Sequence, residues 1–106
     1  MLTKTDKAIA LEFRNSIVKI ISVIDFKVFG SRARGESSEY SDLDVFIKVE
    51  DISTAQRQKI REIAFEVGFE KDRLISTFMA TRKQIEDGPL GANPIIFKIE
   101  NEGIRV

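Results

Sequence analysis

Two short stretches of the sequence contain residues whose types and spacing suit the binding of phosphate and metal. In the first, Gly30 and Ser31 directly follow an apolar run. Glycine allows a sharp turn and a close approach of the ligand, the serine adds a hydroxyl, and a helical turn starting here would add free N–H groups. Together these groups form a small anion site that suits phosphate oxygens. The Gly-Lys-Ser/Thr ending of a Walker A loop is missing, so this is not a P-loop.

The second stretch contains Asp42 and Asp44, two residues apart in a segment where apolar and polar residues alternate. This alternation predicts a strand, from which both carboxylates leave the same face with their Cα atoms ~6–7 Å apart. Paired carboxylates at this spacing suit the divalent ions of phosphoryl-transfer sites. Either stretch alone is more often a plain turn or a solvated strand face. The two together predict Asp42 and Asp44 as metal ligands and catalytic residues.

The composition limits the chemistry available to such a site. The chain has 106 residues, with no cysteine and no histidine. Disulfides, thiolate or imidazole metal ligands and a histidine general base are therefore excluded, and oxygen must hold any catalytic metal. Lys+Arg and Asp+Glu both number 17, and this zero net charge argues against a nucleic-acid binder with a net basic face. Without an apolar run of ~20 residues or an apolar signal core, we expect a cytoplasmic protein and no membrane partner.

The elements that position these residues follow from periodicity and capping signals. The predicted order is a helix over 5–21, strands over 24–29 and 42–48, a helix over 53–67, a strand over 73–80 and a short helix over 81–88. Capping boxes open two helices at Ser53 and Thr81, Thr3 or Thr5 caps the first, and Gly68 is the expected stop of the second. The tail predicts one or two helical turns and a last short strand. We expect one α+β domain over residues 1–106, with a small mixed sheet flanked by helices.

The two stretches together resemble the signature of the minimal nucleotidyltransferases, which belong to the DNA polymerase beta-like nucleotidyltransferase superfamily. The matching residues are Gly30-Ser31-x-Ala33-Arg34-Gly35 and Ser41-Asp42-x-Asp44. The resemblance implies the polymerase beta-like fold and the transfer of a nucleoside monophosphate from a nucleoside triphosphate with Mg²⁺. It also implies that many small relatives are antitoxins paired with a helical toxin of the HEPN ribonuclease class. Some of them adenylylate a tyrosine of that partner.

Carried over to this chain, the resemblance implies a role for each residue of the two stretches. Gly30 and Ser31 hold the β- and γ-phosphates, and Asp42 and Asp44 bind Mg²⁺ in a two-metal site. Arg34 is the expected further nucleotide-binding residue. Arg32 lies in the same loop and either contacts phosphate or is solvated.

One departure from the family pattern concerns a third carboxylate on a later strand. Segment 73–80 contains no acidic residue, and by resemblance the third position falls near Ser76. Asp72 lies four residues earlier, ~13 Å along an extended chain, which is too far to substitute. The loss of one anionic ligand weakens the second metal site and removes the obvious base.

Two functions are therefore compatible with the sequence. The first is a Mg²⁺-dependent nucleotidyltransferase that moves AMP from ATP to a hydroxyl of a partner protein, such as a HEPN-type toxin. The second is a weak or inactive antitoxin that acts by binding its partner. The missing acid favours the second, and so do Ile95, Ile96 and Phe97 if they are exposed rather than part of the core.

Overall fold

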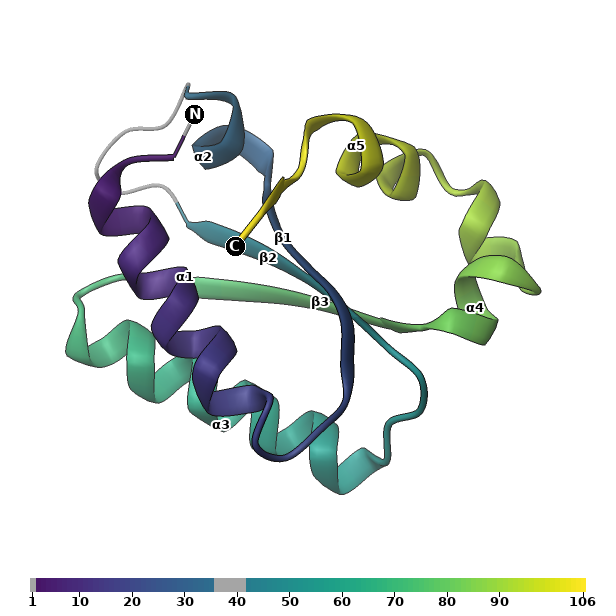
Figure 1. Cartoon of the computed structure of the whole chain (residues 1–106), viewed down its shortest axis with the longest axis horizontal. Coiled ribbons are helices and arrows are strands. Elements are labelled where there is room, and N and C mark those ends of the chain that lie inside the picture. Colours follow the sequence, from purple (N-terminus) through teal and green to yellow (C-terminus); the bar gives the residue numbers. More distant parts are fainter. Residues whose placement is uncertain (1, 36–41) are drawn as a thin grey trace.

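A computed structural model describes residues 2–35 and 42–106 and places a four-stranded sheet between two layers of helices (Figure 1). In chain order the elements are α1 (Lys4–Ile17), β1 (Val23–Phe29), α2 (Gly30–Arg34), β2 (Leu43–Val49), α3 (Thr54–Glu70), β3 (Ile75–Thr81), α4 (Arg82–Glu86), the 3-10 helix η1 (Pro89–Ala92), α5 (Pro94–Glu102) and β4 (Ile104–Arg105). The strand order is β3-β2-β1-β4. Strand β2 is parallel to β3 and antiparallel to β1, which is antiparallel to β4. This mixed sheet confirms the predicted α+β fold. Ser41, which belongs to the second sequence motif, lies outside the described residues.

Three helices begin at capping boxes. Thr3, Ser53 and Thr81 each accept a hydrogen bond from the backbone N–H three residues later, and the side chain of that later residue accepts one from the cap. These reciprocal bonds satisfy N–H groups that a helix start otherwise leaves unpaired. The predicted starts at Ser53 and Thr81 are confirmed, and Thr3 rather than Thr5 caps the first helix.

Two predicted helix ends are wrong. Helix α1 ends at Ile17, not at Ile21, because the Ile17 carbonyl accepts hydrogen bonds from the N–H groups of both Ile20 and Ile21 as the chain turns into β1. Helix α3 continues past Gly68 to Glu70. Gly68 is needed for packing: the Arg73 N–H donates to its carbonyl at 2.8 Å, and a Cβ at Gly68 would collide with the Arg73 carbonyl.

The sheet has an apolar core on each face, because successive residues of β2 point to opposite sides. Leu43, Val45 and Ile47 pack into the larger core under α1 and α3. Phe46 belongs to the smaller core under α4, η1 and α5, together with Ile99. Figure 1 shows these two groups of helices on opposite sides of the sheet. No helix in the described part of the chain is long and apolar enough to cross a membrane.

Helix α5 settles whether the apolar residues of the tail are core or surface. Ile96 is buried and Ile95 is partly buried against the smaller core, so neither forms an exposed docking surface. Phe97 points outwards and is 70% exposed. The helix has nine residues and is therefore slightly longer than the one or two turns that the sequence predicts; it begins where Asn93 caps it and Pro94 occupies its first turn.

Candidate functional site

The pairing of β1 with β2 brings the two predicted stretches together. Phe29, the last residue of β1, is the register partner of Asp44 on β2, and Gly30 follows it at the start of α2. Gly30 has φ +74°, and a Cβ at this position would collide with the Asp44 carboxylate. Only glycine therefore fits both the backbone and the space beside Asp44. Gly35, with φ 75°, ends α2 in the left-handed conformation that favours glycine.

Asp44 is the residue whose electrostatics stand out in this region. Burial raises the pKa of its carboxyl above the ordinary value, and the negative charge of Asp42 raises it further. The positive charge of Arg34 acts in the opposite direction without cancelling the rise. A half-buried carboxylate beside a second one is stabilised by a cation placed between them. This electrostatic pattern is expected of a metal ligand.

The two aspartates differ in their setting. Asp44 lies in β2 and is half-buried, whereas Asp42 is exposed and immediately precedes the strand. Both offer the oxygen ligands that Mg²⁺ prefers, so the donor set fits this ion. Within residues 2–35 and 42–106, no group of three or more acidic residues is placed to hold a metal. The described residues thus supply the pair of carboxylates but no larger cage.

The register between β2 and β3 places Ser76, the neutral residue near the expected third carboxylate position, next to Asp44. Ser76 is the parallel register partner of Asp44, and its side chain is exposed. Register partners on neighbouring strands point to the same face, so the Ser76 hydroxyl lies beside Asp44. Asp72 lies in the turn before β3, where it adopts φ 56°. Ser76 is thus the neighbour of Asp44 on β3, and its assignment to the third position of the family pattern stays a prediction.

The structure gives Arg32 a role that the sequence does not suggest. Its side chain is only 5% exposed and forms an ion pair with Asp6 at 3.5 Å, so it is not solvated. Arg73 donates to the same carboxylate at 2.6 Å. Burial raises the pKa of Asp6, but hydrogen bonds from Arg73 and Thr3 and the charge of Arg32 outweigh it and hold the pKa below the ordinary value.

Arg34, in contrast, stays at the surface beside the predicted site. Its Nη1 lies 3.4 Å from a carboxylate oxygen of Glu102 on α5. A pocket of about 190 Å³ opens here, and its lining also includes Gly30 and Lys98. The two sequence motifs do not predict this contribution of α5. The only signal available was the spacing of Lys98 and Glu102, which places both on one side of a helix.

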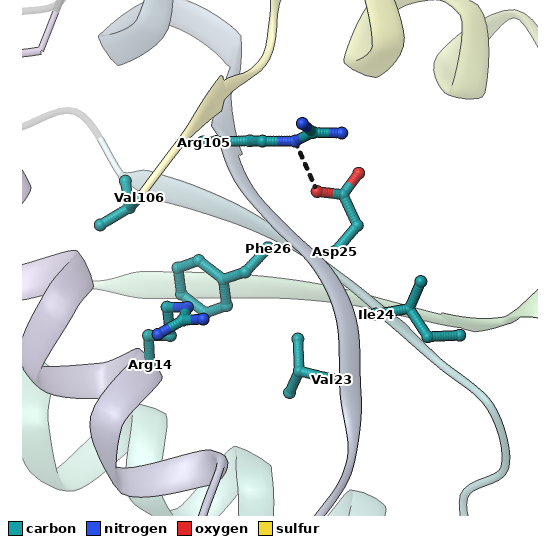
Figure 2. Close-up of a pocket in the computed structure, with 7 residues that line it drawn as sticks. All are labelled: Arg14, Val23, Ile24, Asp25, Phe26, Arg105 and Val106. Carbon is teal, nitrogen blue, oxygen red and sulfur yellow. Dashed lines mark hydrogen bonds and ion pairs between the residues drawn. The ribbon is translucent and has the colours of Figure 1, made fainter.

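A second pocket lies beside the first half of β1, next to β4. Figure 2 shows Arg105 of β4 extending towards Asp25 of β1, and its Nε lies 3.2 Å from the carboxylate. The pocket has a volume of about 310 Å³ and includes Arg14 and Phe26 in its lining. It contains none of the predicted site residues. Its polar groups are already used in part, because Asp25 also forms an ion pair with Lys27 at 3.2 Å.

Comparisons with known proteins identify the family. A family model described as the nucleotidyltransferase domain matches residues 10–106. The chain is also 38% identical over 80 residues to a "putative protein adenylyltransferase" of Methanocaldococcus jannaschii, an alignment that covers 74% of each protein. The chain therefore belongs to the nucleotidyltransferase domain family, which confirms the resemblance seen in the sequence.

Solved structures show the same fold. A structure described as a "putative minimal nucleotidyltransferase" superposes with a TM-score of 0.63 at 20% identity, covering 100% of this chain and 97% of that one. The crystal structure of the toxin-antitoxin MntA-HpeT gives a TM-score of 0.57 at 12% identity, covering 97% of this chain and 72% of that one. At these identities the two structures support the fold alone.

Proposed function

We propose that this protein is a Mg²⁺-dependent nucleotidyltransferase that transfers AMP from ATP to a hydroxyl group of a partner protein. Membership of the nucleotidyltransferase family supports transfer of a nucleoside monophosphate. The name of the 38% identical relative supports a protein as acceptor. The structural likeness to a toxin-antitoxin protein favours a toxin as that partner, and a HEPN-type ribonuclease is the candidate.

The observation that carries this proposal is the contact between Gly30 and Asp44. It brings the start of α2, where the backbone can approach a phosphate, against the carboxylate whose pKa burial raises. A site that holds a triphosphate and a cation together needs these two features side by side. An ordinary turn between strands does not require a glycine at the one point where a carboxylate lies against the backbone.

Each residue of the site has a proposed role. Gly30 and Ser31 hold the terminal phosphates, and Arg34 adds a positive charge at the same place. Asp42 and Asp44 hold Mg²⁺, and Asp44 is the more deeply placed ligand. When bound, the ion neutralises charge on the triphosphate and stabilises the leaving pyrophosphate. The family pattern has a third carboxylate near Ser76, which would take the proton from the acceptor hydroxyl. Because Ser76 is neutral, this proton leaves through another group or through solvent.

Transfer of label from [α-³²P]ATP to the product of the neighbouring gene tests the proposal. With Mg²⁺ present, we expect the wild-type protein to label its partner and Asp44→Asn to lose this activity, because the half-buried metal ligand becomes neutral. Asp72→Asn is the matched control, since Asp72 is exposed and asparagine tolerates its positive φ. Absence of transfer by a wild-type protein that binds ATP would argue against catalysis.

A second function, neutralisation of the partner by binding alone, is favoured by one observation. Ser76 places a neutral hydroxyl beside Asp44, and no other acidic group completes the metal site among the described residues. If the Asp42→Asn/Asp44→Asn double variant neutralises the partner as fully as wild type, binding is sufficient. The Ser76→Asp variant complements this test: a gain of transfer over Ser76→Asn would show that the missing carboxylate limits the reaction.

A further inference from the structure

Helix α5 places two opposite charges, one turn apart, at the pocket beside Gly30. Lys98 and Glu102 both line this pocket of about 190 Å³, together with Gly30 and Arg34. Residues four apart lie on the same side of a helix, so the two side chains reach the pocket from one direction. Apolar contacts hold the helix in place, because Ile96 and Ile99 are buried in the smaller core. The charges are therefore carried by an element that is fixed relative to the site.

Lys98 is a cation with room for an anionic ligand. Its side chain is exposed, and it forms no ion pair with any residue in the ranges 2–35 and 42–106. Arg34 of α2, which also lines the pocket, supplies a second positive charge. A backbone that can be approached closely at Gly30, with two cations around it, offers a phosphate group more positive charge than the two sequence motifs alone provide.

Glu102 has the opposite sign at the same place. Its carboxylate lies 3.4 Å from Nη1 of Arg34, and both side chains are more than a third exposed. Exposed pairs of this kind contribute little to folding stability, so stability does not explain the contact. The Glu102 carboxylate therefore adds a negative charge to the pocket, and this charge repels an incoming anion.

We propose that Lys98 and Glu102 set the affinity of this site for the terminal phosphate of the nucleoside triphosphate, with opposite effects. Lys98 attracts the phosphate, whereas the negative charge of Glu102, which lies beside Arg34, opposes its binding. The inference rests on the proposed function, since it assumes that Gly30 and Arg34 hold a triphosphate. It assigns to α5 a role in substrate binding that lies outside the two sequence motifs.

Calorimetric titration of the whole protein with Mg²⁺-tripolyphosphate and with Mg²⁺-ATP tests this proposal. For both ligands we expect Lys98→Gln to weaken binding about fivefold and Glu102→Gln to strengthen it about fivefold, as one unit charge a few ångströms away does in water. The Lys98→Gln/Glu102→Gln double variant should return close to wild type. Both shifts should shrink at high salt, because exposed charges are screened.

Two matched controls separate a local effect from the loss of charge as such. Glu100→Gln removes an exposed carboxylate from the same helix, and Lys83→Gln removes an exposed lysine from α4. Neither residue lines the pocket, so both variants should bind like wild type. The melting temperatures of all variants show whether a change in binding reflects a change in folding.

The possible outcomes distinguish this inference from the proposed function. If wild type binds neither ligand, the proposed function fails and this inference fails with it. If wild type binds both ligands but the two variants leave the affinity unchanged or move it in the same direction, only the role of α5 is wrong. Opposite shifts from Lys98→Gln and Glu102→Gln, without shifts in the controls, support it.

Discussion

Gly30 shows at the level of a single residue how backbone geometry and chemistry depend on each other. The residue adopts a positive φ, and its missing Cβ leaves the space that the Asp44 carboxylate fills. An alanine here would be strained by its backbone and would push the carboxylate away. Glycine is therefore required here for the position of the Asp44 carboxylate as well as for the turn.

We expect Gly30→Ala to lower the free energy of unfolding by roughly 1–2 kcal/mol and to abolish Mg²⁺-dependent nucleotide binding, because the Asp44 carboxylate must move. Chemical denaturation measures the first effect and calorimetric titration the second. Gly35→Ala carries a similar backbone strain, with φ 75°, at the other end of α2. It should cost similar stability while leaving binding intact; an equal loss of binding in both variants would mean that backbone strain alone is responsible.

At the level of elements, Asp6 joins three segments that are distant in the sequence. Its carboxylate accepts a hydrogen bond from the backbone N–H of Thr3, the cap of α1, and forms ion pairs with Arg32 of α2 and with Arg73, which precedes β3. Its side chain is only 1% exposed. A buried carboxylate with two arginines fixes the short helix α2, which begins at Gly30. The network thereby positions the candidate site without taking part in its chemistry.

Replacing Asp6 by asparagine leaves two guanidinium groups facing a neutral side chain, and we expect a loss of about 3–5 kcal/mol at neutral pH. Because the pKa of Asp6 is lowered in the folded state, its contribution is present above the ordinary value of 3.8 and disappears as the pH falls through the folded value. The stability difference between wild type and Asp6→Asn should therefore shrink in acid. Urea unfolding at neutral and acid pH measures it. A difference that does not change with pH would contradict this assignment, and the exposed Asp51→Asn serves as control.

At the level of the whole molecule, two cores of unequal size share one sheet. The smaller core fixes α5 and, with it, the wall of the pocket that faces Gly30 and Arg34. Ile99 is its completely buried centre, whereas Phe97 on the same helix is 70% exposed. Stability and the shape of the candidate site are therefore linked through a few residues of the tail.

We expect Ile99→Ala to destabilise the protein by about 2–4 kcal/mol, because it leaves a cavity between α5 and the sheet. Phe97→Ala should change the stability by less than about 0.5 kcal/mol, because the ring is mostly in solvent. Thermal unfolding of both variants checks the contrast. Equal losses would mean that α5 does not pack as the structure has it.

Local sequence signals predicted much of this protein. The strand periodicity around Asp44 identified which residues of β2 face the larger core, and the capping boxes at Ser53 and Thr81 located two helix starts. Such signals work because a hydrogen bond or a pleat involves residues only two to four positions apart. The same locality made Gly30 and Asp44 recognisable as candidate site residues, and it made the absence of an acid around Ser76 visible.

The tertiary structure decided what depends on residues distant in the sequence. The sequence predicts that Gly68 ends the helix, but it lies within α3, where the Arg73 carbonyl occupies the space that a Cβ would need. The sequence places Arg32 in a loop, but its side chain is buried and forms an ion pair with Asp6. The approach of Lys98 and Glu102 to Gly30 likewise depends on how α5 packs over the sheet. No pattern along the chain encodes these contacts, because the sequence separation between partners is unrelated to their distance in the folded protein.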